Sequence, residues 1–149
     1  MSADILSTQS AELVQPAEPA YVSTARHFTA EMLVMWGLAT EDRDCAELIV
    51  DELAANAARH GRAEMSVRLT ICGRGLVITV TDTGDSRSQP HGPADGTPAD
   101  EHGRGLDIVR RLAGSTAIHD DEHTHRVVTT RCLAPLHRPV TPAGSAQPV

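Results

Sequence analysis

Two stretches of the chain carry hydrophobic residues at the three- and four-residue spacing of an amphipathic helix. The first predicts a helix over residues 20–36, which Gly37 would end in a left-handed conformation. The second predicts a helix over residues 41–60, with Thr40 as its N-cap and Gly61 as its stop. Acidic residues fall in the first turn of this second helix, where the helix dipole favours negative charge.

Farther along the chain, hydrophobic and polar residues alternate, which is typical of strands with one buried face. We expect four such strands, at residues 65–71, 76–81, 115–118 and 127–133. The first two form a hairpin, because residues 72–75 (Cys-Gly-Arg-Gly) suit a tight turn. A third helix is expected to begin at Gly103 and Gly105. These elements predict the α+β class: a two-layer α/β sandwich whose sheet is mixed but mainly antiparallel, with helices on one face.

The chain of 149 residues has room for one domain with a modest core. Residues 1–18 indicate a flexible N-terminal lead with a short strand near Leu13 and Val14, and residues 135–149 a disordered, proline-rich tail. The domain is therefore expected over residues 19–134. Within it, residues 83–102 are rich in Gly, Pro, Ser and Asp, and a polar loop of that length is typical of a mobile lid.

Composition argues against several classes of protein. The net charge of −7 and the pI near 5.5 argue against a nucleic-acid or acidic-membrane surface. All 13 cationic residues are arginines, which excludes a P-loop nucleotide site because such a site needs a lysine on the phosphates. No apolar stretch reaches the roughly 20 residues of a membrane helix. The N-terminus lacks the features of a signal peptide, so we expect a cytoplasmic protein.

The second predicted helix places two polar residues on its hydrophobic face. Glu52 and Asn56 are four residues apart, so they lie one above the other within the stripe that includes Ile49 and Leu53. A carboxylate and an amide facing a sheet are costly when they find no partner. Either they form a satisfied pair or reach solvent, or they line a pocket that holds a cation and water. In such a pocket Asn56 suits Mg²⁺, which prefers oxygen ligands, and Glu52 suits a general base.

Three further features fit a site for phosphate and purine. Arg59, one helical turn after the polar pair, either pairs with a phosphate or is a solvated surface charge. Asp82, at a strand end and followed by Gly84, either makes an ordinary Asp-x-Gly turn or accepts a hydrogen bond from an exocyclic amine such as that of adenine. Gly103 and Gly105 weaken a helix, but they permit a phosphate to approach the N–H groups of a helix start.

Three segments together resemble the motifs of the GHKL (histidine kinase-like) ATPase superfamily. Residues 47–61 resemble its N-box, residues 80–84 (Val-Thr-Asp-Thr-Gly) its first glycine box, and residues 103–109 (Gly-Arg-Gly-Leu-Asp-Ile-Val) its second. The likeness spans about Tyr21 to Leu133 and is strongest to the anti-sigma factor serine/threonine kinase branch, which the Trp-Gly-Leu step at residues 36–38 also resembles. It implies the Bergerat ATP-binding fold of that superfamily.

By this resemblance, Asn56 would be the Mg²⁺ ligand and Glu52 the catalytic base. The other positions would contact ATP itself, at the phosphates, the base or the pocket wall: Arg59, His60, Asp82, Gly84, Gly103, Arg104, Gly105 and Leu106. The polar segment at residues 83–102 would be the ATP lid. ATP and Mg²⁺ are therefore the implied cofactors.

The resemblance also implies a function and partners. Members of this branch phosphorylate a serine on a STAS-domain anti-anti-sigma factor and sequester a sigma factor. We therefore expect this chain to be a kinase of this type whose partners are a STAS-domain protein, a sigma factor or both; the likeness also allows a homodimer, which nothing in the composition demands. Two other classes stay open. The first is a catalytically silent, ATP-gated binding module for a sigma factor or STAS protein. The second is an orphan histidine-kinase catalytic domain, which would need a dimerisation helix pair bearing a histidine that this chain lacks.

Two positions depart from the family pattern. The first glycine box often has a second glycine where Ser86 stands. A Gly-Thr step usually leads the last strand, whereas residues 126–129 read Arg-Val-Val-Thr. Which threonine would contact the base is therefore left open by the sequence.

Overall fold

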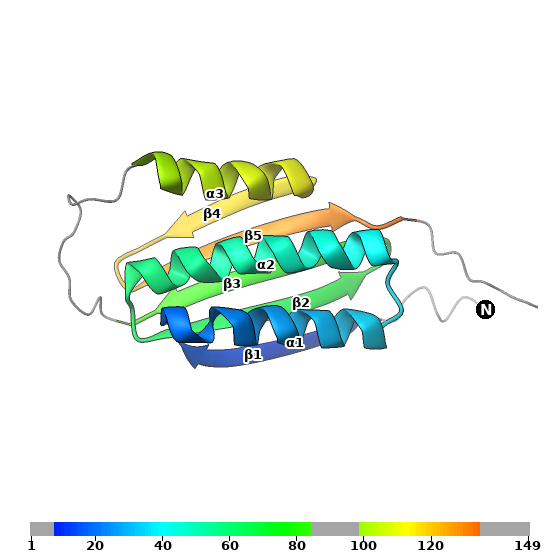
Figure 1. The fold of residues 1–149 in the computed structure, drawn as a ribbon, viewed down its shortest axis with the longest axis horizontal. Helices are drawn as coiled ribbons and strands as arrows, with labels where there is room; N and C mark the ends of the chain where they lie inside the picture. The colour runs from blue at the N-terminus through cyan, green and yellow to red at the C-terminus, as the bar shows by residue number, and fades with distance from the viewer. Residues whose placement is uncertain (1–7, 85–98, 135–149) are drawn as a thin grey trace, which may run out of the picture.

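The computed structural model describes residues 8–84 and 99–134; for residues 99–104 it describes the backbone alone. Its elements, in chain order, are β1 (Gln9–Pro16), the 3₁₀ turn η2 (Pro19–Tyr21), α1 (Val22–Met35), α2 (Thr40–His60), β2 (Glu64–Cys72), β3 (Gly75–Thr83), α3 (Ala99–Leu112), β4 (Ser115–Asp120) and β5 (Thr124–Cys132). The five strands form one sheet in the order β1-β2-β3-β5-β4, and the three helices lie together over one of its faces (Figure 1). The predicted two-layer α+β sandwich is confirmed. The four pairings of the sheet are all antiparallel, where the prediction allowed a mixed sheet.

The ends of α1 and α2 show how far local sequence determines the helices. Gly37 and Gly61 follow the two helices with φ of 75° and 66°, which confirms both predicted left-handed ends. The predicted N-cap is wrong by one residue, because Ala39 holds that position and Thr40 is already helical. The Thr40 hydroxyl instead accepts a hydrogen bond of 3.0 Å from Arg43 Nη2 within the first turn.

The first strand is longer than the sequence predicts. β1 pairs with β2 along its whole length, from Gln9 opposite Ile71 to Pro16 opposite Glu64. The description of residues 1–18 as a flexible lead is therefore wrong for β1, and the domain begins at about Gln9. As an edge strand, β1 buries only part of one face, so its hydrophobic alternation is weak. Residues 1–7 and the expected tail, residues 135–149, lie outside the described residues.

The third helix begins earlier than predicted. α3 starts at Ala99, so Gly103 and Gly105 lie inside the helix rather than at its start. Ala99 is a strong helix former, and the Asp100 and Glu101 that follow it carry the charge that a helix N-terminus favours. Most of the expected lid, residues 83–102, lies outside the described residues.

The core fills the space between the helices and the sheet. α2 lies at its centre and packs against β2 and β3. Its buried face combines small and branched residues: Ala46, Ile49, Val50, Leu53, Ala54 and Ala57. They meet alternate residues of the two strands: Met65, Val67, Leu69, Leu76, Ile78 and Val80. The small side chains let α2 lie close to the sheet, and α3 packs along its flank with Val109 buried.

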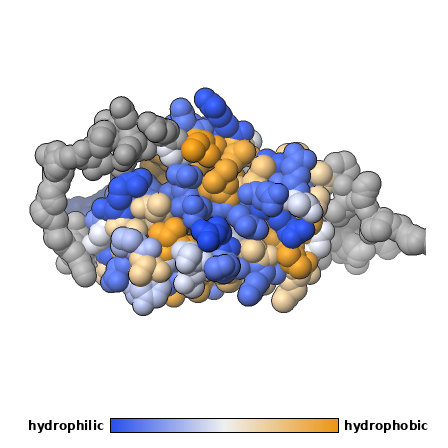
Figure 2. Space-filling view, in the orientation of Figure 1, coloured by the Kyte–Doolittle hydropathy of each residue, from blue (hydrophilic) through white to orange (hydrophobic). Residues whose placement is uncertain are grey.

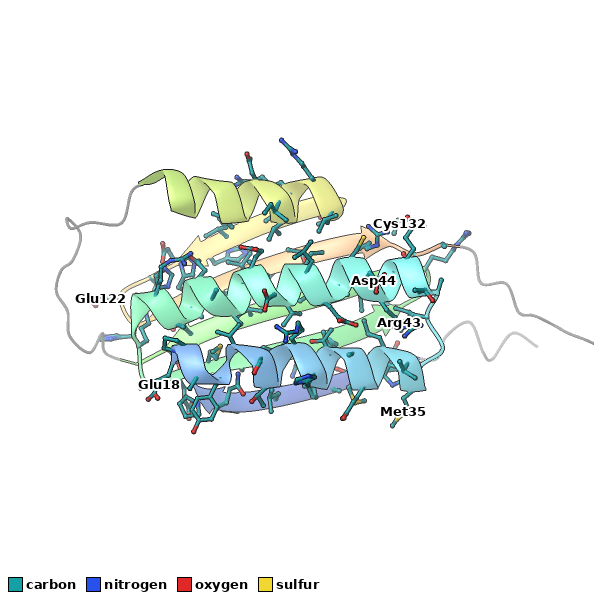
Figure 3. The ribbon with its side chains drawn as sticks, in the orientation of Figure 1. Glu18, Met35, Arg43, Asp44, Glu122 and Cys132 are labelled. Carbon is teal, nitrogen blue, oxygen red and sulfur yellow. The ribbon has the colours of Figure 1, made fainter. Side chains whose placement is uncertain are left out.

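A buried ion pair fastens the end of the molecule where α2 begins. The Asp42 carboxylate is 3 % exposed; its Oδ1 lies 3.0 Å from Arg131 Nε on β5, and its Oδ2 accepts a hydrogen bond of 2.9 Å from the Ala134 N–H. Arg131 Nη1 also donates to the Leu112 carbonyl at the C-terminal end of α3, at 2.7 Å. Figure 3 shows this end of the ribbon at the labels Asp44 and Cys132, and the opposite end at Glu122.

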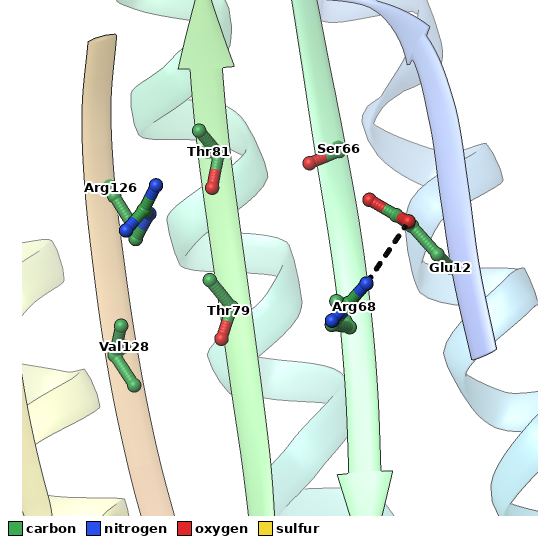
Figure 4. A pocket seen from close by; sticks show the side chains of 7 residues that line it. All are labelled: Glu12, Ser66, Arg68, Thr79, Thr81, Arg126 and Val128. Carbon is green, nitrogen blue, oxygen red and sulfur yellow. Dashed lines mark ion pairs between the residues drawn. The ribbon is translucent and has the colours of Figure 1, made fainter. Parts of the chain in front are cut away.

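None of the described helices covers the opposite face of the sheet. A groove of about 510 Å³ lies there, between Arg68 on β2 and Arg126 on β5 (Figure 4). Its floor carries the hydroxyl groups of Thr79 and Thr81, and Arg68 makes an ion pair of 3.6 Å with Glu12 on β1. None of the predicted site residues lines this groove, so it is not the predicted site.

The face that carries the helices is mainly hydrophilic (Figure 2). Exposed large hydrophobic side chains of the helices include Leu48 on α2 and the adjacent Val34 and Met35 at the end of α1. None of the described helices has the length and apolar character needed to cross a membrane.

Candidate functional site

The polar pair on α2 faces α3 across a narrow crevice. Glu52, Asn56 and Arg59 line one wall, Gly105 and Leu106 line the other, and the gap between them is too narrow to hold a water molecule. Glu52 and Asn56 are half-buried. Within the part of the chain whose side chains the structure describes, neither one has a hydrogen bond or an ion pair. A carboxylate and an amide are thus presented to the crevice, and the satisfied pair that the sequence left open is not formed among these residues.

Gly105 explains how α3 comes so close to Glu52. A Cβ built at Gly105 would lie 3.0 Å from Glu52 Oε1, which is tighter than ordinary side-chain contacts. The glycine therefore lets the helix backbone lie directly against the carboxylate. This contact brings the N-box helix and the second glycine box together, as the motifs predict.

A second group of predicted residues meets where α2 ends. The Asp82 side chain, near the end of β3, is 1 % exposed, and its Oδ2 lies 3.0 Å from His60 Nδ1 in a hydrogen bond. His60 follows Asn56 by one turn of α2, a rise of about 6 Å. The crevice and the Asp82 carboxylate are therefore two parts of one site that runs along α2.

Gly84 is required by its conformation and by its surroundings. Its φ is +106°, outside the range that other residues adopt readily, and an added Cβ would lie 2.7 Å from the Ala63 Cβ. Its N–H donates to the His123 carbonyl at 3.1 Å, which joins the end of β3 to the turn between β4 and β5. The first glycine box thus fixes the backbone beside Asp82.

Two residues outside the predicted set complete this end of the site. Arg62 Nε lies 3.0 Å from Asp82 Oδ1. His125 is the residue opposite Asp82 in the β3–β5 register, and its ring meets that of His60 edge to face, with centroids 4.5 Å apart. The only sequence signal for Arg62 is its place directly after the Gly61 that ends α2. His125 could be found only from the strand register.

His125 also reaches the turn between β4 and β5. Its Nδ1 lies 2.9 Å from Asp120 Oδ1, and this hydrogen bond, more than the charges around it, lowers the pKa of the Asp120 carboxyl below its usual value. The β3–β5 register also bears on a question that the sequence left open, namely which threonine near the last strand would contact the base. Thr129 lies opposite Ile78, four residue pairs along the register from Asp82, and its hydroxyl donates to the Ile78 carbonyl at 3.3 Å. His125, rather than a threonine, occupies the strand position facing Asp82.

The remaining predicted residues are only partly described. Gly103 and Arg104 lie within α3, where the structure describes the backbone alone. Leu106 lies beside Gly105 in the crevice wall. The structure therefore brings together Glu52, Asn56, Arg59, Gly105 and Leu106 in the crevice, and His60, Asp82 and Gly84 at the end of α2.

Comparison with protein families decides which family this site belongs to. A model of the histidine kinase-like ATPase domain matches residues 15–131, which include every predicted site residue. The chain belongs to this family. The resemblance drawn from the three motifs is thereby confirmed at the level of the superfamily. The histidine kinase-like ATPase domain begins within β1, in agreement with the described fold.

The histidine kinase-like fold is also found among solved structures. The structure is similar to the crystal structure of the RsbU and RsbW domains of Rv1364c from Mycobacterium tuberculosis, with a TM-score of 0.67 and 20 % sequence identity. The match covers 89 % of this chain and 35 % of that chain, so this chain spans about a third of the length of its structural relative. Among curated proteins, no sequence matches this chain.

Proposed function

We propose that this histidine kinase-like ATPase binds Mg-ATP and transfers a phosphoryl group to a serine of a STAS-domain partner, as a kinase of the anti-sigma type. The observation that carries the proposal is the Glu52 carboxylate. It is half-buried in the crevice, has no partner among the side chains that the structure describes, and lies against Gly105 of the second glycine box. A carboxylate held in that way is available to accept a proton.

Nucleotide binding would use both parts of the site. Asp82 Oδ1 is buried and has no hydrogen bond among the described residues, which suits an acceptor for the amine of adenine. Asn56, one turn of α2 before His60, offers an amide oxygen, the ligand type that Mg²⁺ prefers. This single oxygen donor fits Mg²⁺, which would take its other ligands from the phosphates and water. Bound Mg²⁺ would neutralise charge on the phosphates, and the remaining steps fall to the residues of the chain.

Phosphoryl transfer would use Glu52 and Arg59. Glu52 accepts the proton of the partner's serine hydroxyl as the bond between its oxygen and the γ-phosphorus forms, and the bond from that phosphorus to ADP breaks. Arg59 lines the same crevice, where its guanidinium offsets charge on the transferring group. An acidic base at position 52 suits a serine acceptor, because a hydroxyl needs a stronger base than an imidazole does.

The partner is inferred from likeness to the anti-sigma branch. The motifs resemble that branch, and the fold is similar to a structure that includes an RsbW domain. A STAS-domain protein as substrate and a sigma factor as ligand are therefore the partners we propose.

The proposal is tested with the full chain, labelled ATP, Mg²⁺ and the STAS-domain proteins of the source organism. The chain should bind ADP in calorimetry and label a serine on one of these proteins. Glu52→Gln should keep ADP affinity within about threefold and lose labelling by at least about 100-fold, which is the scale of general-base catalysis. Glu47→Gln, the same change on the same helix, is the matched control. Labelling unchanged by Glu52→Gln would remove Glu52 from the mechanism, and nucleotide binding without any labelled partner would favour the ATP-gated binding module.

A further inference from the structure

Arg62 makes an unusual contact with Asp82. Arg62 Nε lies 3.0 Å from Asp82 Oδ1, and the two side chains are 17 % and 1 % exposed. Despite this distance, the N–H does not point at the oxygen, so neither atom has a hydrogen bond among the described residues. The contact is therefore an ion pair without a hydrogen bond, and it leaves acceptor capacity unused on Oδ1.

The second oxygen of the same carboxylate is already engaged. His60 Nδ1 lies 3.0 Å from Asp82 Oδ2, in hydrogen-bonding geometry. The two oxygens therefore differ: Oδ2 is bonded to His60, and Oδ1 carries unused acceptor capacity in a buried position. A buried acceptor without a hydrogen bond is costly, and a ligand that presents an N–H group removes that cost.

Arg62 is itself held from two sides. Its Nη1 donates to the Gly84 carbonyl at 3.3 Å and to the Glu122 carbonyl at 3.2 Å. Gly84 follows β3, and Glu122 lies in the turn between β4 and β5, at the end of the molecule labelled in Figure 3. Two backbone segments thus position the guanidinium, and the guanidinium in turn positions the Asp82 carboxylate. A lysine at this position would keep the charge but would lack the planar set of donors.

We propose that Arg62 is a positioning residue for base recognition, which holds the Asp82 carboxylate turned so that Oδ1 meets the exocyclic amine of a 6-aminopurine. The inference rests on the proposed nucleotide binding and adds to it a residue that none of the three motifs assigns to base recognition. By this inference, the preference of the nucleotide site for a purine with an amine rather than a carbonyl at its 6-position depends on Arg62.

The test measures base preference by calorimetry of the full chain with ADP and with IDP, whose base carries a carbonyl where adenine has the amine. The wild type should bind ADP at least tenfold more tightly than IDP. Arg62→Gln should reduce that ratio at least fivefold through a loss of ADP affinity, and Arg62→Lys should reduce it less. Arg26→Gln is the matched control, because it also breaks an arginine–aspartate ion pair, the one that Arg26 makes with Asp51 at 3.1 Å.

The outcomes separate this inference from the proposed function. A wild type that binds neither nucleotide refutes the proposed function itself. A wild type that prefers ADP, together with Arg62 variants that keep its ADP-to-IDP ratio, overturns the role of Arg62 alone. Equal losses of ADP and IDP affinity also overturn it, because they indicate only a structural role. Arg62→Lys retains the charge beside Asp82, so it gives a folded variant for the measurement if Arg62→Gln unfolds.

Discussion

Replacing Gly84 with alanine tests whether the first glycine box is fixed by packing. The alanine would have to adopt a φ of +106° and place its Cβ 2.7 Å from the Ala63 Cβ and 3.2 Å from the Ala63 nitrogen. The nearest atoms belong to the backbone and to the first carbon of a side chain, neither of which can swing aside. The chain must therefore move where the connection between α2 and β2 meets the end of β3.

The structure sets the magnitude of this effect. A residue held in such a backbone conformation costs about 1–3 kcal/mol, and an overpacked contact costs a further amount of about 1–3 kcal/mol. We expect Gly84→Ala to lower the free energy of unfolding by about 2–6 kcal/mol, a large part of the roughly 5–15 kcal/mol of a typical domain. Gly61→Ala is the control, because Gly61 has a φ of +66° and no atom within 4 Å of an added Cβ. It should lose only about 1–2 kcal/mol.

Urea unfolding followed by circular dichroism gives the free energies, and a double-mutant cycle with Ala63→Gly isolates the contact. Ala63→Gly removes the carbon that the new methyl group meets, so it should be less destabilising in the Gly84→Ala background than in the wild type. Equal losses from Gly84→Ala and Gly61→Ala, together with no coupling between positions 63 and 84, would refute the reasoning.

Two further predictions concern the ion pairs at the two ends of the molecule. Asp42→Ala leaves the Arg131 guanidinium without its buried partner and should lower the free energy of unfolding by about 3–5 kcal/mol in urea titrations; a loss below about 1 kcal/mol would show that the pair contributes little. Asp120→Asn should cost less than about 1 kcal/mol at pH 7, because the carboxylate is largely exposed. Since the pKa of Asp120 is lowered in the folded state, its contribution is present above the unfolded value near 3.8 and is lost as the pH falls through the folded pKa. The difference between Asp120→Asn and the wild type, measured from pH 3 to pH 7, should therefore shrink on acidification, and a growing difference would contradict this.

The sequence predicts the helices and the central hairpin well because their signals are local. Gly37 and Gly61 end α1 and α2 in the expected conformation, and residues 72–75 form the expected turn. β1 is underestimated because an edge strand needs only part of one face to be hydrophobic. The start of α3 is misplaced because Gly103 and Gly105 suggest a boundary, whereas the residues before them favour a helix.

The site is predicted in part for the same reason. Glu52 and Asn56 conflict with the hydrophobic stripe of their own helix, so the sequence alone indicates a special role for them. The contacts of Arg62 and His125 with the Asp82 end depend on how α2 meets β3 and on how β5 pairs with β3. Such contacts follow from tertiary packing and register, which no local pattern contains.

The tie between Arg131 and the Leu112 carbonyl has a mechanical consequence for the crevice. This bond fixes the C-terminal end of α3, whereas Gly105 lies near the middle of the helix. The distance between Gly105 and Glu52 then changes when α3 tilts about that end. Sliding the whole helix along α2 would require breaking the bond to Arg131.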